Sequence, residues 1–206
     1  MKTKKIFLVR HGQTDYNLKG VAQGSGIDAP INATGRQQAK AFFQTYKDIP
    51  FDKVYTSVLQ RSIQSVQSFI ALDIPHEKLL GLNEISWGNR EGKSFVSGED
   101  HYKVVTNAWK NGDVDAKIEA GESPLEVQKR QKIALTHILS QEKEDTILIC
   151  MHGRAMRILL CLMLNYNLKH MDLFSHSNLG VYKINYNGSS FSIESANDVR
   201  HLNASF

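Results

Sequence analysis

Short apolar runs alternate with segments of helical periodicity along most of the chain. Two runs, residues 6–9 and 146–151, are apolar without alternation and lead into polar sequence that contains glycine, so we expect strands buried on both faces. A third strand is predicted at 53–56, after Pro50. Strands buried on both faces are typical of a parallel sheet that helices cover.

Helices are predicted between these strands. Apolar residues recur at helical spacing over 34–46, from about Leu59 onward, and over 155–164. A further helix is expected from Ser123 to about Leu139, because Ser123 begins a capping box and proline follows it at the first helical position.

The end of the chain has a different pattern. Asn187-Gly188 joins two alternating segments, 180–186 and 190–195, as expected for an antiparallel hairpin. The whole order predicts an α/β fold: a three-layer sandwich with a mostly parallel central sheet, helices on both faces and this hairpin at one edge. Residues from about 82 to 122 are poorly periodic, so we expect an excursion over the core of a single domain covering 1–206.

Composition narrows the range of functions. The net charge is +4, yet lysine and arginine are spread along the chain, which disfavours a nucleic-acid binder and favours a small anionic ligand. Cys150 and Cys161 stand in apolar stretches, as buried reduced thiols do, and no apolar run is long enough to span a membrane. We therefore expect a cytoplasmic protein without a membrane partner, and a homodimer is compatible with the sequence.

Two predicted strands end in the same way, with histidine followed by glycine. His11 follows the first strand and His152 follows the later one. In open α/β sheets ligands bind beyond the carboxyl ends of the strands, so neighbouring strands would bring both imidazoles to one site. The alternative is that each histidine ends its strand and forms only local hydrogen bonds.

Two arginines add positive charge at the same edge. Arg61 falls in the first turn of a predicted helix, where the helix dipole disfavours a cation unless an anion lies nearby. Arg10 precedes His11, and its planar guanidinium matches two oxygens of a phosphoryl group. The pattern favours a phosphoryl pocket, although Arg61 could instead pair with a surface carboxylate.

The motifs that surround these residues have a shared order and spacing. They occupy residues 8–17, 23–24, 28–39, 56–65, 82–92, 121–123, 148–153 and 197–202. Together they resemble the histidine phosphatase superfamily, in the branch related to cofactor-dependent phosphoglycerate mutase. The resemblance covers nearly the whole chain and implies a phosphatase of a small phosphorylated substrate that needs no metal and no cofactor.

Roles follow from the resemblance by position. It implies that His11 attacks phosphorus and becomes a phosphohistidine, while Arg10, Arg61 and His152 hold the equatorial oxygens. It also implies that the 82–122 excursion covers the active site. The substrate-binding residues that it implies are Asn17, Gln23, Gly24 and Gly153.

Glu84 is the candidate general acid, with Glu91 as the rival carboxylate and Asp15 as a more distant one. The segment after Glu84 departs from the mutase pattern, so hydrolysis is the preferred reaction and mutase activity the alternative. Two other classes stay open: a phosphate-binding module that has lost catalysis, and a metal-dependent hydrolase using His11, His152 and Asp15.

Several residues receive structural interpretations. Tyr16, Trp87 and Trp109 are expected to pack the loop region. Arg154 stands where many relatives have a small or neutral residue, and with Arg157 it either extends positive charge towards a second acidic group or forms a surface salt bridge. The histidines interpreted as surface or structural residues are His76, His101, His137, His170, His176 and His201.

Overall fold

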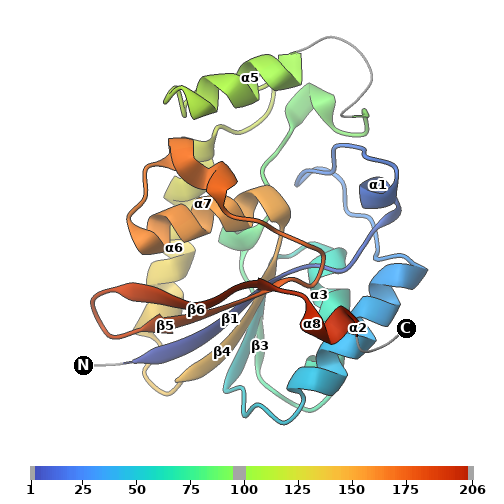
Figure 1. Cartoon of the computed structure of the whole chain (residues 1–206), viewed down its shortest axis with the longest axis vertical. Helices are drawn as coiled ribbons and strands as arrows, with labels where there is room; N and C mark the ends of the chain where they lie inside the picture. The colour runs from blue at the N-terminus through green and yellow to red at the C-terminus, as the bar shows by residue number, and fades with distance from the viewer. Residues whose placement is uncertain (1–2, 95–100, 204–206) are drawn as a thin grey trace.

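A computed structural model of the chain describes residues 3–94 and 101–203, and the strands within this part form one six-stranded sheet (Figure 1). The strand order is β3-β2-β4-β1-β5-β6. The strands are β1 (Lys4–Arg10), β2 (Lys53–Thr56), β3 (His76–Lys78), β4 (Thr146–Met151), β5 (Val181–Tyr186) and β6 (Phe191–Asp198).

The first four strands along the chain run parallel, and the last two form an antiparallel hairpin. β4 lies between β1 and β2, and β5 pairs antiparallel with both β1 and β6. This arrangement confirms the predicted α/β class and its C-terminal hairpin. The sequence did not predict β3, because its residues His76, Glu77 and Lys78 are all polar, and it pairs only with β2.

The helices agree with the predictions for the long segments. The chain breaks the helix expected from Leu59 into α3 and α4 at Val66, where φ is −121° and ψ is 14°. The α-helices are α1 (Asp15–Leu18), α2 (Ala33–Tyr46), α3 (Gln60–Ser65), α4 (Gln67–Ile70), α5 (His101–Lys110), α6 (Pro124–Ser140), α7 (Gly153–Leu164) and α8 (Arg200–Asn203). Short 3-10 helices are η1 (Leu80–Leu82), η2 (Gly88–Arg90) and η3 (Leu168–Leu173).

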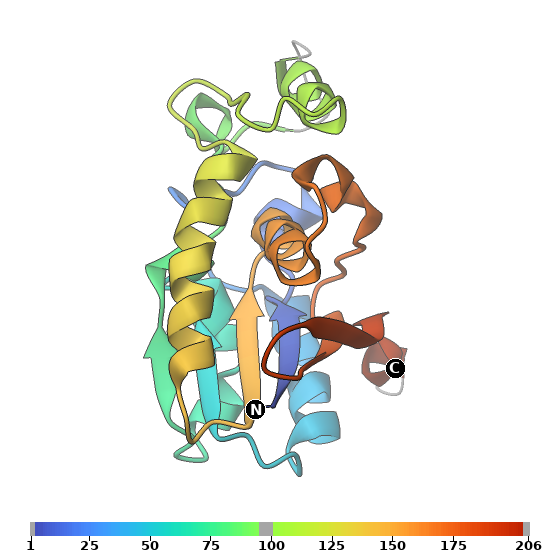
Figure 2. The ribbon, with the colours of Figure 1, turned by 90° about the vertical axis from the view of Figure 1, so that its left-hand side faces the viewer.

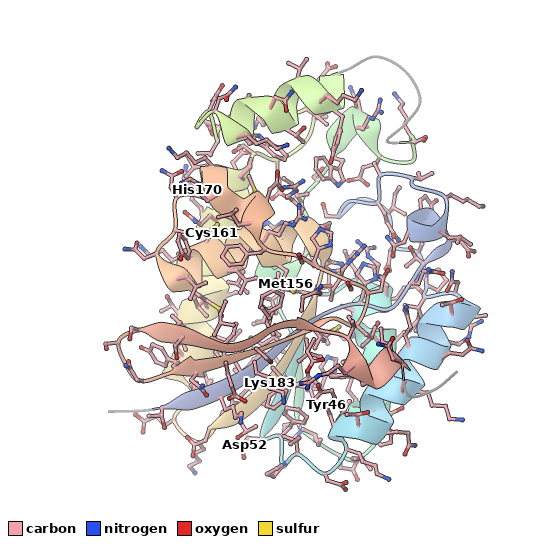
Figure 3. The ribbon with its side chains drawn as sticks, in the orientation of Figure 1. Tyr46, Asp52, Met156, Cys161, His170 and Lys183 are labelled. Atoms are coloured by element: carbon pink, nitrogen blue, oxygen red, sulfur yellow. The ribbon has the colours of Figure 1, made fainter. Side chains whose placement is uncertain are left out.

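Alternate side chains of β1 pack into two different cores. Ile6 and Leu8 belong to the core that contains α6 and α7, whereas Phe7 and Val9 belong to the core that contains α2 and α4. Burial on both faces explains why the apolar run in β1 does not alternate. In the second core, Nζ of Lys183 on β5 lies 5.6 Å from the ring centroid of Tyr46 on α2, which links the hairpin to that layer (Figure 3).

The ends of α6 and α7 are fixed by local contacts. The predicted capping box of α6 is present: the Ser123 hydroxyl accepts from the Glu126 amide, and the Glu126 carboxylate accepts from the Ser123 amide. Helix α7 begins two residues after the end of β4, so the first turn of α7 lies at the carboxyl edge of the sheet.

The excursion stands beyond the carboxyl ends of β1 and β4, with α7 between it and the sheet, as Figures 1 and 2 both show. The Trp87 and Trp109 rings stack with centroids 5.9 Å apart, and the Trp109 indole donates to the Ala116 carbonyl at 2.7 Å. Both tryptophans therefore pack within the excursion, as expected, and Tyr16 is partly buried.

Within the described residues, every helix is too short or too polar to cross a membrane.

Candidate active site

His11 and His152 meet at the carboxyl edge of the sheet. Arg10 at the end of β1 pairs with Met151 at the end of β4, so the residues that follow both strands lie side by side. The two imidazole centroids are 5.2 Å apart, and both residues are buried. This confirms the predicted convergence of the two histidines.

The hydrogen bond at His11 identifies its protonated nitrogen. Nδ1 lies 2.7 Å from the Gly12 carbonyl oxygen, which can only accept, so Nδ1 carries the proton. Nε2 of the neutral ring therefore keeps its lone pair. Burial, and then the charges of Arg61 and Arg10, lower the pKa of His11 well below its usual 6.5. His11 is neutral around physiological pH.

His152 has hydrogen-bond partners for both ring nitrogens. Nε of Arg61 donates to Nδ1 at 3.1 Å, so a neutral ring carries its proton on Nε2, which lies 2.7 Å from the Ser57 hydroxyl oxygen. Burial, followed by the charges of Arg61 and His11, lowers the pKa of His152. The sequence analysis did not single out Ser57, although it lies in the motif block that contains Arg61.

The Arg61 side chain forms hydrogen bonds to the loop before α2 in addition to its bond to His152. Its Nη1 donates to the Ile27 carbonyl at 2.6 Å and its Nη2 to the Gly24 carbonyl at 3.0 Å. With the bond to His152, these contacts use three of the five guanidinium N–H groups. Burial lowers the pKa of Arg61 to about 10, partly opposed by Glu84, so the side chain stays cationic.

The side chains of Arg10 and Gln23 each contain a buried nitrogen atom that has no hydrogen-bond partner in the described part of the chain. These atoms are Nε of Arg10 and Nε2 of Gln23. Nη1 of Arg10 donates to the His176 carbonyl at 3.0 Å, and burial lowers the pKa of Arg10 to about 10. Buried donors without acceptors are rare, so these two indicate a ligand that offers oxygen atoms.

Glu84 lies between η1 and η2, and its side chain reaches the first turn of α7. Its carboxylate accepts from the backbone amides of Ile85, Arg154 and Ala155 at 2.9, 3.1 and 2.8 Å. These bonds fix the carboxylate beside Gly153, at the edge of the site.

The rival carboxylates have other surroundings. Glu91 accepts from the amides of Gly26 and Trp87, and a Cβ atom at Gly24 would lie 2.2 Å from it, so its position supports the loops. Asp15 is exposed and accepts from Asn32 at 3.3 Å. In residues 3–94 and 101–203, no three His, Cys, Asp or Glu side chains are grouped as a metal site would need.

A pocket of about 300 Å³ opens beside these groups. Of the predicted substrate-binding residues, Asn17, Gln23 and Gly153 line it, whereas Gly24 does not and instead accepts from Arg61 through its carbonyl. Its lining residues are Asn17, Val21, Gln23, Glu84, Trp87, Tyr102, Gly153, Arg154, Arg157 and His176.

His176 corrects the interpretation of the remaining histidines, because it lines the pocket. Its Nδ1 lies 3.4 Å from Nη1 of Arg10, and burial beside Arg10 lowers its pKa to about 3. No periodic pattern surrounds it in the sequence, so only the fold brings it here. Asn178, two residues later, donates to the His11 carbonyl at 2.9 Å and was also missed.

Four other histidines with the same interpretation have described side chains, and none of the four lines the pocket. His76 bonds to Thr56, His137 pairs with Glu77, and His201 packs between the rings of Phe42 and Tyr46. His170 is exposed near the outer end of α7 (Figure 3). The side chain of His101 lies outside the described part of the structure.

Comparison with known proteins identifies the family. A family model for the histidine phosphatase superfamily (branch 1) matches residues 6–199. A Danio rerio protein named fructose-2,6-bisphosphatase TIGAR B is 33% identical over 161 residues, which cover 76% of this chain and 59% of that protein. An Escherichia fergusonii protein named probable phosphoglycerate mutase GpmB is 28% identical over 207 residues, covering 97% of this chain and 95% of that protein.

A solved structure agrees with these matches. The crystal structure of a phosphoserine phosphatase mutant from Entamoeba histolytica, in complex with phosphoserine, has a TM-score of 0.83 and 27% identity. The match covers 97% of this chain and 99% of that one. The chain belongs to the histidine phosphatase superfamily, and it is a phosphatase of branch 1.

Proposed function

We propose that this phosphatase hydrolyses a small phosphorylated metabolite through a phosphohistidine formed on His11. The observation that carries the proposal is the hydrogen bond from Nδ1 of His11 to the Gly12 carbonyl, which leaves a lone pair on Nε2. This nitrogen belongs to a buried neutral imidazole beside two guanidinium groups. A neutral nucleophile next to fixed positive charge suits attack on an anionic phosphoryl group.

In the first step, Nε2 of His11 forms a bond to phosphorus while the bond from phosphorus to the ester oxygen breaks. Arg10 and Arg61 supply the positive charge that stabilises the phosphoryl oxygens. The unpartnered Nε of Arg10 and the two unused N–H groups of Arg61 are among the donors available for them. His152, bonded to both Arg61 and Ser57, would hold that guanidinium in place.

Glu84 handles the protons in this proposal. Its carboxyl group gives a proton to the departing ester oxygen, and the resulting carboxylate takes one from the water that attacks the phosphohistidine. The bond between nitrogen and phosphorus then breaks, which releases inorganic phosphate and restores neutral His11. Glu84 is placed for this role because it lines the pocket beside Gly153.

A panel of phosphomonoesters assayed with the wild type and with His11→Ala tests the proposal. We expect the wild type to hydrolyse several esters and His11→Ala to hydrolyse none at a measurable rate. Rapid quenching in alkali should trap a phosphorylated wild-type protein that loses phosphate in acid, as phosphoramidates do. An active His11→Ala variant would contradict the assignment.

The role of Glu84 has a separate test. We expect Glu84→Gln to slow hydrolysis of an alkyl phosphate by about 100-fold or more, because the alkoxide leaves poorly without a proton. Nitrophenyl phosphate should be affected far less, since its leaving group needs little protonation. Steady-state kcat/KM values for both esters measure the difference.

Glu91→Gln is the matched control. This substitution removes a nearby carboxylate that accepts hydrogen bonds from loop amides, so it should change kcat/KM for both esters by the same factor. Equal losses on the two esters in Glu84→Gln would remove the general-acid assignment and leave Glu84 a structural role.

The similarity to the Escherichia fergusonii protein favours mutase activity as the second candidate. A mutase would return the phosphoryl group from His11 to a second hydroxyl of the product instead of to water. Incubation with 3-phosphoglycerate distinguishes the two reactions: we expect inorganic phosphate to accumulate, whereas faster formation of the 2-phosphate isomer would favour the mutase.

We infer that residues 1–206 act as one domain, because the family match spans 6–199 and the excursion contributes Trp87 and Tyr102 to the same pocket. We also infer a cytoplasmic location. Cys150 and Cys161 are buried free thiols, as suits a reducing compartment. Cell fractionation tests the location, and recovery in the culture medium would contradict it.

A further inference from the structure

The pocket that contains Glu84 and Gly153 is also lined by a second cationic group. We propose that Arg154 and Arg157 form a subsite for an anionic group, a carboxylate or a phosphate, carried by the leaving group of the substrate. The inference rests on the proposed function, since it names the substrate class: phosphomonoesters with a second negative charge.

Positive charge at this subsite exceeds negative charge. Nη1 of Arg154 and Nη1 of Arg157 lie 2.6 and 2.7 Å from the same carboxylate oxygen, Oδ1 of Asp172. Nζ of Lys110 lies 4.0 Å from the other oxygen of Asp172. Three cations therefore share one carboxylate, and the excess charge favours a further anion.

Both arginines are held in place, although they lie at the pocket. Their side chains are 11% and 18% exposed, and the Arg154 guanidinium carbon lies 5.4 Å from the centroid of the Trp109 ring. Nε of Arg157 donates to the Phe174 carbonyl at 2.8 Å. Side chains fixed in advance lose little conformational freedom when a ligand binds.

Both guanidinium groups retain unused donors. Arg154 uses Nη1, and Arg157 uses Nε and Nη1. Across residues 3–94 and 101–203, Nη2 of each arginine has no hydrogen-bond acceptor. An anion could therefore bind without displacing Asp172.

The position of the subsite fits a leaving group. Arg154 and Arg157 are three residues apart in the first turns of α7, and both line the pocket together with Gly153. The Arg154 amide donates to the Glu84 carboxylate at 3.1 Å, so the candidate general acid lies at the start of the same helix. A leaving group whose oxygen takes a proton from Glu84 would extend along α7 towards these arginines.

Matched substrate pairs test the subsite. Three carboxylates of increasing length, 2-phosphoglycolate, 3-phosphoglycerate and 6-phosphogluconate, are compared with the alcohols 2-hydroxyethyl phosphate, glycerol 3-phosphate and sorbitol 6-phosphate. In at least one pair we expect kcat/KM to favour the carboxylate by about tenfold or more, the usual effect of one charge-assisted hydrogen bond. The ratio within a pair is the measured quantity.

Variants connect that ratio to the two arginines. Arg154→Gln and Arg157→Gln should each lower it by about tenfold, whereas Asp172→Asn should raise it because the competing carboxylate is gone. Arg200→Gln is the matched control, since Arg200 forms a similar ion pair with Asp198 at 2.6 Å but its side chain is 84% exposed and lies outside the pocket. If the two arginines formed only a surface salt bridge and did not contact the ligand, the carboxylate-to-alcohol ratio would not rise in Asp172→Asn.

Calorimetry with His11→Ala tests binding without turnover, using the same six compounds. We expect the carboxylates to bind more tightly than their alcohols in this background, and the preference to vanish when Arg154→Gln is added. Ratios near one in all three pairs, in both kinetics and calorimetry, would overturn the subsite even if His11-dependent hydrolysis is confirmed. If no phosphomonoester is hydrolysed, the proposed function fails, and calorimetry alone decides the subsite.

Discussion

At the residue scale, the main feature is the protonation state of His11. An exposed imidazole would be partly charged near pH 6.5 and would then lack the lone pair that attack on phosphorus requires. Burial and two neighbouring guanidinium groups keep the ring neutral, and the Gly12 carbonyl selects the tautomer with a free Nε2. In the proposed mechanism, the arginines that attract the phosphoryl group therefore also keep His11 neutral.

This state can be measured by NMR titration of the His11 ring. We expect no protonation from about pH 8 down to about pH 6, since the pKa lies well below the usual value. Arg10→Gln should raise the pKa of His11, because it removes a nearby positive charge. A titration midpoint of the wild-type ring near that of histidine in an unstructured peptide would show that the fold does not keep His11 neutral.

At the scale of the elements, the two strand ends share a sequence signature but differ in packing. Gly12 follows β1 and approaches the first turn of α2, where a Cβ atom would lie 2.8 Å from the Gly35 carbonyl oxygen. Gly153 starts α7, and the atoms nearest to its Cβ would be those of the Arg10 and His176 side chains, at 3.3 Å. The first glycine is required by backbone packing, whereas the second leaves room for flexible side chains.

Alanine substitutions test this difference. Gly12→Ala should lower the free energy of unfolding by roughly 1–3 kcal/mol, because the backbone of α2 has to move. Gly153→Ala is the matched comparison and should cost less, since side chains can adjust. Urea denaturation of both variants gives the two values, and an equal or larger loss in Gly153→Ala would refute the packing argument.

At the scale of the whole molecule, the sheet order gathers distant segments at one edge. The ends of β1 and β4 supply the histidines, the segment before β5 supplies His176, and the excursion supplies Trp87 and Tyr102. This assembly buries three histidines that the fold keeps neutral: His11, His152 and His176. Their neutrality makes stability depend on pH.

The sign follows from proton binding in the two states. Unfolded histidines bind protons below about pH 6.5, whereas His11, His152 and His176 in the fold do not, so the unfolded state gains protons as pH falls. The free energy of unfolding should therefore decrease below about pH 6.5, by roughly 1 kcal/mol per pH unit for each such histidine. Urea denaturation at about pH 7 and about pH 5 measures the slope. His176→Asn should reduce it, and an unchanged slope would show that His176 does not contribute.

Local sequence patterns were sufficient to predict most of the strands and long helices. The apolar runs of β1 and β4, the capping box of α6 and the turn between β5 and β6 depend on residues close in sequence, so their predictions are confirmed. The polar strand β3 was missed because it depends on its pairing with β2 and not on its own residues.

The sequence by itself determined the α/β class and placed histidine with glycine after two buried strands, because burial and capping act over a few residues. Only the tertiary structure decided that His11 and His152 face each other, that His176 lies against Arg10, and that Arg154 and Arg157 share Asp172. These contacts join segments far apart in the chain, and their geometry depends on the order of the strands and on how the helices pack on them. No local pattern encodes that order.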